Sequence, residues 1–69
     1  MAAANLEPAF HLDFSFNGKG WEVWSFDHDQ TVMTARFEYQ RTHPVPGRSV
    51  RLLGPKGDVL LFDKGPEKK

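Results

Sequence analysis

Residues 9–16 alternate strictly between apolar and polar side chains, and this pattern constrains the fold more than any other feature of the chain. Polar residues separate the apolar positions Phe10, Leu12, Phe14 and Phe16. A period of two places the apolar side chains on one face of a β-strand. The segment therefore predicts a strand with one buried face, whose other face carries His11, Asp13 and Ser15.

Three further segments have the composition of short strands. Residues 21–26 are rich in Trp, Val and Phe, and the turn sequence Asn17–Gly20 separates them from the first strand. Residues 49–53 and 59–62 flank Gly54–Gly57, which has proline and glycine where a hairpin turn needs them. These segments predict two hairpins.

Residues 31–40 are ambiguous between a strand and a helix. A strand places Met33, Ala35, Phe37 and Tyr39 on one face, whereas a helix divides the same apolar side chains between two stripes. Because the alternation is more regular than either helical stripe, we predict a strand, with a helix as the alternative.

Five short strands with hairpin spacing predict an all-β fold. We expect a small five-stranded antiparallel meander, rolled into a barrel or half-barrel. Residues 1–8 are predicted as a flexible leader, residues 9–63 as a single β domain, and residues 64–69 as a disordered charged tail. The predicted core consists of Phe10, Leu12, Phe14, Phe16, Trp21, Val23, Phe37, Val50, Leu52, Leu60 and Phe62.

The length of the first turn decides which tryptophan faces outward. A four-residue turn pairs Leu12 with Ser25, and it then places Trp24 and Phe26 on the polar face with His11. Trp21 is in the core on this interpretation, whereas a three-residue turn would exchange the two tryptophans. Large aromatics on a polar face predict a binding surface.

Composition excludes several classes of protein. The chain has no cysteine, which excludes a disulfide framework and cysteine-based zinc sites. It contains no apolar run of the ~20 residues that a membrane helix needs. Lysine and arginine together number 9, as do aspartate and glutamate, so the formal net charge is zero. We predict a cytoplasmic protein with no membrane partner.

The chain offers little that suggests catalysis or metal binding. His11, Asp13 and Ser15 have the residue types of a hydrolase triad, but alternate residues of a strand are ~6.6 Å apart, beyond hydrogen-bond reach for short side chains. The turn at 27–29 has metal-ligand residue types, but no neighbouring motif completes a coordination shell. We therefore expect no enzymatic activity, no metal and no cofactor.

A neutral chain with surplus aromatics predicts a small protein-interaction module, such as an adaptor, inhibitor or subunit. We expect it to dock on a larger protein or on itself as a homodimer. The alternative is a small barrel that binds single-stranded nucleic acid through the basic segment 41–51, since cations and exposed rings suit phosphates and bases. The predicted partner-binding residues are Trp24, Phe26, His11, Arg48 and Arg51.

Overall fold

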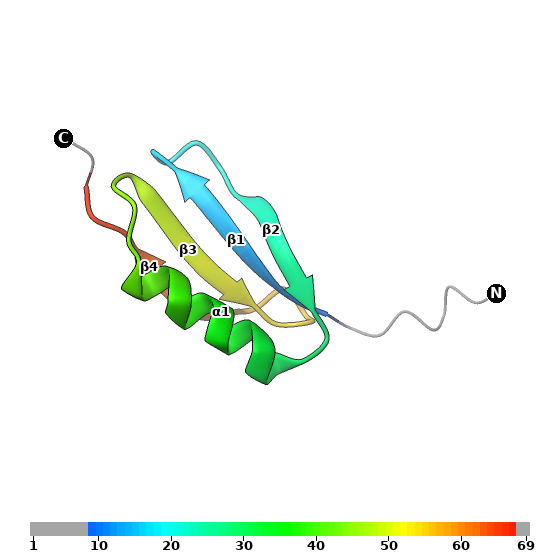
Figure 1. Cartoon of the computed structure of the whole chain (residues 1–69). Coiled ribbons are helices and arrows are strands. Elements are labelled where there is room, and N and C mark those ends of the chain that lie inside the picture. Colours follow the sequence, from blue (N-terminus) through cyan, green and yellow to red (C-terminus); the bar gives the residue numbers. More distant parts are fainter. Residues whose placement is uncertain (1–8, 68–69) are drawn as a thin grey trace.

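A computed structural model of the chain describes residues 9–67. Two β-hairpins flank one helix in this part of the chain (Figure 1). The elements are β1 (Phe10–Phe16), β2 (Glu22–Asp27), α1 (Gln30–Thr42), β3 (Arg48–Leu53) and β4 (Val59–Lys64).

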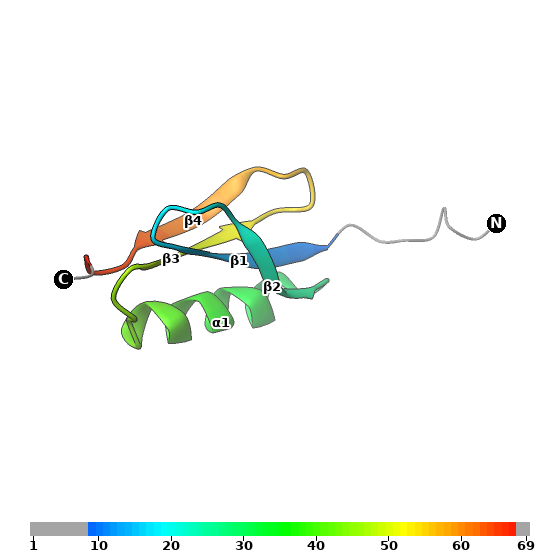
Figure 2. The same cartoon turned by 90° about the horizontal axis from the view of Figure 1, so that it is seen from above.

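The four strands form one open sheet in the order β2-β1-β3-β4, and every neighbouring pair is antiparallel. The predicted antiparallel sheet of short strands is thus confirmed. Because β2 and β3 both run antiparallel to β1, they share a direction, and the chain must cross the sheet between them. Helix α1 makes this crossing, and Figure 2 shows it lying on one face of the sheet.

The strand predicted over residues 31–40 is wrong, because this segment belongs to α1. Asp29 caps the helix, and its carboxylate accepts hydrogen bonds from the amides of Thr31 at 2.9 Å and Val32 at 3.3 Å. Met33 and Phe37, one turn apart, are the buried residues of the helix. The fold is therefore mostly β, with a four-stranded open sheet and a helix, rather than a five-stranded all-β barrel.

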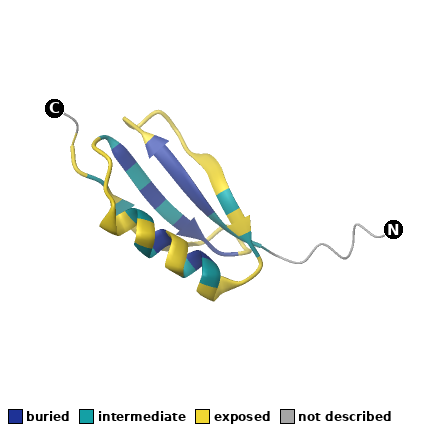
Figure 3. Ribbon diagram, viewed as in Figure 1, coloured by how far each residue is buried: buried dark blue, intermediate teal, exposed yellow. Residues whose placement is uncertain are grey.

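The core lies between α1 and the sheet face beneath it. Figure 3 shows burial concentrated along the two central strands. The predictions for Phe16, Trp21, Val23, Leu60 and Phe62 are wrong, since all five are exposed. Val23 and Phe62 lie on the sheet face that α1 does not cover, and Trp21 lies against that same face. Phe16 is on the covered face but at the end of β1, and Leu60 is the extra residue of the bulge in β4. The core cluster consists of Leu12, Phe14, Met33, Phe37, Val50 and Leu52, with Phe10 and Leu61 partly buried against it.

Arg48 joins the end of the helix to β3. Its side chain is buried, and Nη2 donates to the carbonyls of Gln40 at 3.2 Å and His43 at 3.1 Å. The guanidinium also lies 4.7 Å from the centroid of the Phe14 ring. A cation at a helix C-terminus satisfies carbonyls that have no partner within the helix. Arg48 therefore stabilises the packing of α1 on the sheet.

Both outer strands contain a β-bulge. In the first hairpin Leu12 pairs with Ser25 and Asp13 with Val23, so Trp24 is the extra residue. In the second hairpin Leu52 pairs with Leu61 and Leu53 with Val59. A bulge increases the local twist and leaves the edge of a sheet less suited to pairing with another strand.

Beyond β4, residues 65–67 return to the start of β3. The amide of Gly47 donates to the carbonyl of Pro66 at 2.8 Å, and a Cβ on Gly65 would clash with the carbonyl oxygen of Arg48. The predicted leader (1–8) and residues 68–69 of the predicted tail lie outside the described residues. The predicted limits of the β domain, residues 9–63, therefore stay a prediction. Among residues 9–67 there is no helix long and apolar enough to span a membrane.

Candidate functional site

The sheet face opposite α1, here called the open face, is the main candidate for a functional surface. Cross-strand partners point to the same face of a sheet, so the register assigns each side chain to a face. His11 pairs with Phe26 and Leu53, and Asp13 pairs with Val23 and Arg51. The open face thus carries His11, Asp13, Ser15, Val23, Phe26, Ser49, Arg51, Leu53, Val59, Phe62 and Lys64.

A charged network occupies the centre of the open face. The two carboxylate oxygens of Asp13 contact different partners: Oδ1 lies 2.9 Å from His11 Nδ1, and Oδ2 accepts from Arg51 Nε at 3.0 Å. The Asp13 side chain is only 4% exposed. The prediction that His11 and Asp13 are too far apart to hydrogen-bond is therefore wrong, because the imidazole is long enough to reach back along the strand.

Trp21 covers this network. The guanidinium of Arg51 lies 4.2 Å from the centroid of the indole, in cation–π geometry. The indole also meets the Phe62 ring edge-on, with centroids 6.2 Å apart. Positive backbone φ angles at Asn17 and Gly18 turn the chain sharply just before Trp21. The carboxylate, the guanidinium and the indole thus form successive layers above the sheet.

Exposed apolar side chains surround the network and form what we call the apolar rim. Given the usual size of these residues, the exposed area sums to on the order of 500 Å². An apolar patch of several hundred Å² on a small protein is often a functional surface. The rim consists of Trp21 (36% exposed), Val23 (60%), Phe26 (69%), Val59 (52%) and Phe62 (56%).

The structure brings together three of the five predicted partner-binding residues. His11, Phe26 and Arg51 lie on the open face. Arg48 is instead buried beneath the helix terminus. Trp24 stacks on Phe14 at the helix-facing side, with ring centroids 4.8 Å apart, because the bulge moves it off the open face.

Trp21 occupies the place predicted for Trp24. Phe62, which was predicted to belong to the core, also lies on the open face, next to Val59. The last hairpin is apolar on both faces, with Val59, Leu60, Leu61 and Phe62 in succession. This continuous apolar run was the available signal. A strand whose sheet has its core on one face needs apolar residues on that face only, so apolar residues on both faces indicate a second apolar surface.

The basic segment 41–51 makes contacts within the domain. Arg41 donates from Nε to Glu38 at 2.8 Å, and this hydrogen bond and charge attraction raise the pKa of Arg41. His43 stacks on Tyr39 with ring centroids 4.1 Å apart. Arg48 caps the helix, and Arg51 pairs with Asp13. The segment therefore does not present a row of uncommitted cations.

The acidic turn before α1 has a local structural role. Asp27 accepts a hydrogen bond from the amide of Asp29 at 2.8 Å, and Asp29 caps the helix. Within residues 9–67, no three His, Cys, Asp or Glu side chains are grouped as they would be to hold a metal ion. These two carboxylates bind backbone amides at the start of the helix.

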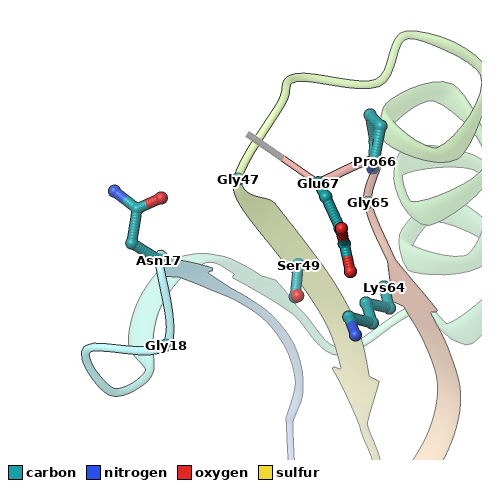
Figure 4. A pocket seen from close by; sticks show the side chains of 8 residues that line it. All are labelled: Asn17, Gly18, Gly47, Ser49, Lys64, Gly65, Pro66 and Glu67. Atoms are coloured by element: carbon teal, nitrogen blue, oxygen red, sulfur yellow. The ribbon is translucent and has the colours of Figure 1, made fainter. Parts of the chain in front are cut away.

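A shallow hollow of about 420 Å³ lies at one end of the sheet (Figure 4). Its charged side chains are Lys64 and Glu67, which have opposite signs and leave no net charge to select a ligand. The remaining lining residues are Asn17, Gly18, Gly47, Ser49, Gly65 and Pro66. The open face is thus the better candidate.

Comparisons with protein-family models, curated proteins and solved structures find no match for this chain. The open face, with its central network and apolar rim, therefore provides the basis for assigning a function.

Proposed function

We propose that this protein is a small non-enzymatic interaction module that docks on a protein surface through its open face. The observation that carries the proposal is the apolar rim around a charge-neutralised centre. Asp13 and Arg51 already pair with each other, so a partner that covers them does not leave either charge unpaired. Tryptophan and arginine at the centre of an apolar patch are the residue types that dominate binding energy at protein interfaces.

Single-stranded nucleic acid remains a second candidate partner, with less support. Binding of the phosphate backbone needs lysine or arginine side chains that are available to neutralise phosphates, whereas Arg41, Arg48 and Arg51 have partners within the domain. Titration of a single-stranded oligonucleotide at several salt concentrations tests this candidate. We expect little binding at physiological salt. Tight binding with a steep salt slope, reduced by Arg51→Ala, would favour nucleic acid instead.

The proposal that the protein is not an enzyme is supported by the arrangement on β1. A hydrolase triad needs the histidine between the nucleophile and the acid. Here the acid Asp13 stands between His11 and Ser15 along the strand, and its second oxygen is bound by Arg51.

Site-specific photo-crosslinking in the native cells tests the docking proposal. A photoreactive phenylalanine analogue replaces Phe26 or Phe62 on the open face, or Tyr39 on α1 as a control. Tyr39 is 59% exposed and Phe62 is 56% exposed, so the two positions are equally accessible. We expect covalent adducts to protein from positions 26 and 62 but not from position 39. No adduct from either open-face position, or equal yields from all three, would refute the proposal.

A further inference from the structure

We infer that the occupant of the open face is a second copy of this chain, packed face to face to form a two-fold β-sandwich. This inference rests on the proposed function and specifies the partner. The partner's sheet would do for the open face what α1 does for the opposite face, and it would add buried apolar area to a domain whose own core is small.

The dimensions of the open face fit a second sheet of the same size. Four strands ~4.8 Å apart, with about six residues each at ~3.3 Å, give a face of roughly 20 Å by 20 Å. The apolar rim supplies on the order of 500 Å², and the partly exposed side chains of His11 and Arg51 add to it. A stable dimer needs about 800 Å² from each partner, which this face provides only if it is covered over its whole extent. A second copy has a face of matching extent.

The charges of the open face permit self-association. The central carboxylate and guanidinium neutralise each other in each copy, and the chain as a whole has a formal net charge of zero. Lys64, at the end of β4, adds one positive charge to the open face of each copy. A two-fold axis parallel to the strands places β4 of one copy above β2 of the other, so the two lysines lie on opposite sides of the interface.

A two-fold axis parallel to the strands also matches the two sides of the apolar rim. It places β2 of each copy above β4 of the other. His11 pairs with Phe26 on one side and with Leu53 on the other, and Leu53 in turn pairs with Val59. Phe26 and Val59 therefore lie in the same row, at one end of the sheet. Each would therefore face the other across the interface, and the exposed side chains of both outer strands would be covered together.

The edges of the sheet are less suitable for dimerisation than its face. Both outer strands contain a bulge, at Trp24 in β2 and at the pairing of Leu53 with Val59 in β4. A bulge interrupts the row of backbone groups that a strand of another chain would pair with. The geometry thus favours packing of faces over extension of the sheet.

Sedimentation equilibrium at micromolar concentrations tests the inference. The wild-type chain should have twice its monomer mass of 7.9 kDa. Phe26→Lys and Phe62→Lys should each weaken self-association by about 100-fold or more. Tyr39→Lys introduces the same charge on the equally exposed outer side of α1 and should leave the dimer intact. A monomeric wild type, or a Tyr39→Lys variant as weak as the other two, would overturn the inference.

Spin-label distances test the geometry independently of the lysine variants. The chain has no cysteine, so one engineered cysteine carries one label per copy. Lys64→Cys places the label on the open face, and Arg41→Cys places it on the helix. Because facing sheets lie ~10 Å apart, the distance between copies should be clearly shorter from position 64 than from position 41. The opposite order would show that the helical sides meet, and would refute the face-to-face arrangement.

The mass of the photo-crosslinked adduct separates failure of this inference from failure of the proposed function. An adduct of twice the chain mass from positions 26 and 62 supports both. An adduct with a different protein, together with a monomeric purified chain, leaves the docking function standing and refutes the second copy. No adduct from either position refutes the docking function itself.

Discussion

The buried pair of Asp13 and Arg51 should couple strongly in a double-mutant cycle. Asp13→Ala removes two contacts of a carboxylate, at 2.9 Å to His11 and 3.0 Å to Arg51. Hydrogen bonds to charged groups contribute ~1.5–3 kcal/mol each. Since the His11 and Arg51 side chains are 31% and 25% exposed and can recover water, we expect a total loss of about 2–3 kcal/mol.

Arg51→Ala should cost more, about 3–4 kcal/mol of the free energy of unfolding. It leaves the Asp13 carboxylate, which is 4% exposed, with His11 as its remaining hydrogen-bond partner. It also removes the cation beneath the Trp21 indole. The double variant should lose about as much as Arg51→Ala alone, because no unpaired carboxylate is left. The coupling energy then equals the loss from Asp13→Ala alone, about 2–3 kcal/mol.

Urea unfolding of the four proteins measures this coupling. Every protein should also carry Phe26→Lys, so that self-association does not contribute to stability. All four proteins are measured in the same concentration of a stabilising osmolyte, which keeps the weaker variants folded. The osmolyte is needed because the free energy of unfolding of a domain of this size is only ~3–5 kcal/mol. Single losses that add within ~0.5 kcal/mol would refute the reasoning, since independent sites behave in that way.

Three further substitutions test the packing of the helix and of the chain beyond β4. Asp29→Ala removes the N-cap of α1 and should lower the free energy of unfolding by about 1 kcal/mol in thermal melts followed by circular dichroism; an unchanged melting temperature would contradict the cap. Arg48→Met keeps the apolar stem but loses both carbonyl contacts at the helix end, and should cost about 1–3 kcal/mol in urea unfolding. Gly65→Ala should cost a similar amount, because its Cβ would meet the backbone of Arg48; a neutral result would show that residues 65–67 do not lie against β3.

The strands were predictable from the sequence because their signals are local. The alternation over residues 9–16 identifies β1, and glycine-containing turns mark the hairpins. The pairings of Leu12 with Ser25 and of His11 with Phe26 are confirmed. These two pairs lie on the far side of the bulge from the turn, where the alternation alone sets the register.

The helix was not predicted because its signal is weak and its cause is non-local. A helix that covers one sheet face buries a narrow stripe, here Met33 and Phe37. The same residues also belong to an alternating pattern with Ala35 and Tyr39, which looks like a strand. What decides the conformation is the need to cross from β2 to β3 over the intervening β1, and no local pattern records that requirement.

The candidate site was predicted in part, for a related reason. The polar face of β1 and the outward position of Phe26 follow from alternation. The exchange of Trp21 and Trp24 follows from the bulge opposite Leu12 and Asp13, which alternation cannot reveal. The burial of Arg48 depends on where the helix ends, so it could not be predicted while the helix itself was missed.

The strand order β2-β1-β3-β4 has a consequence for the kinetics of folding. Each outer strand joins the sheet through a short hairpin, and hairpins form within microseconds. The pairing of β1 with β3 instead joins segments distant in sequence, since Asp13 and Arg51 are 38 positions apart. We expect the closing of this long loop, with α1 packed over it, to be the slow step. Substitutions in β1, α1 and β3 should therefore slow refolding, whereas substitutions in the outer strands should chiefly accelerate unfolding.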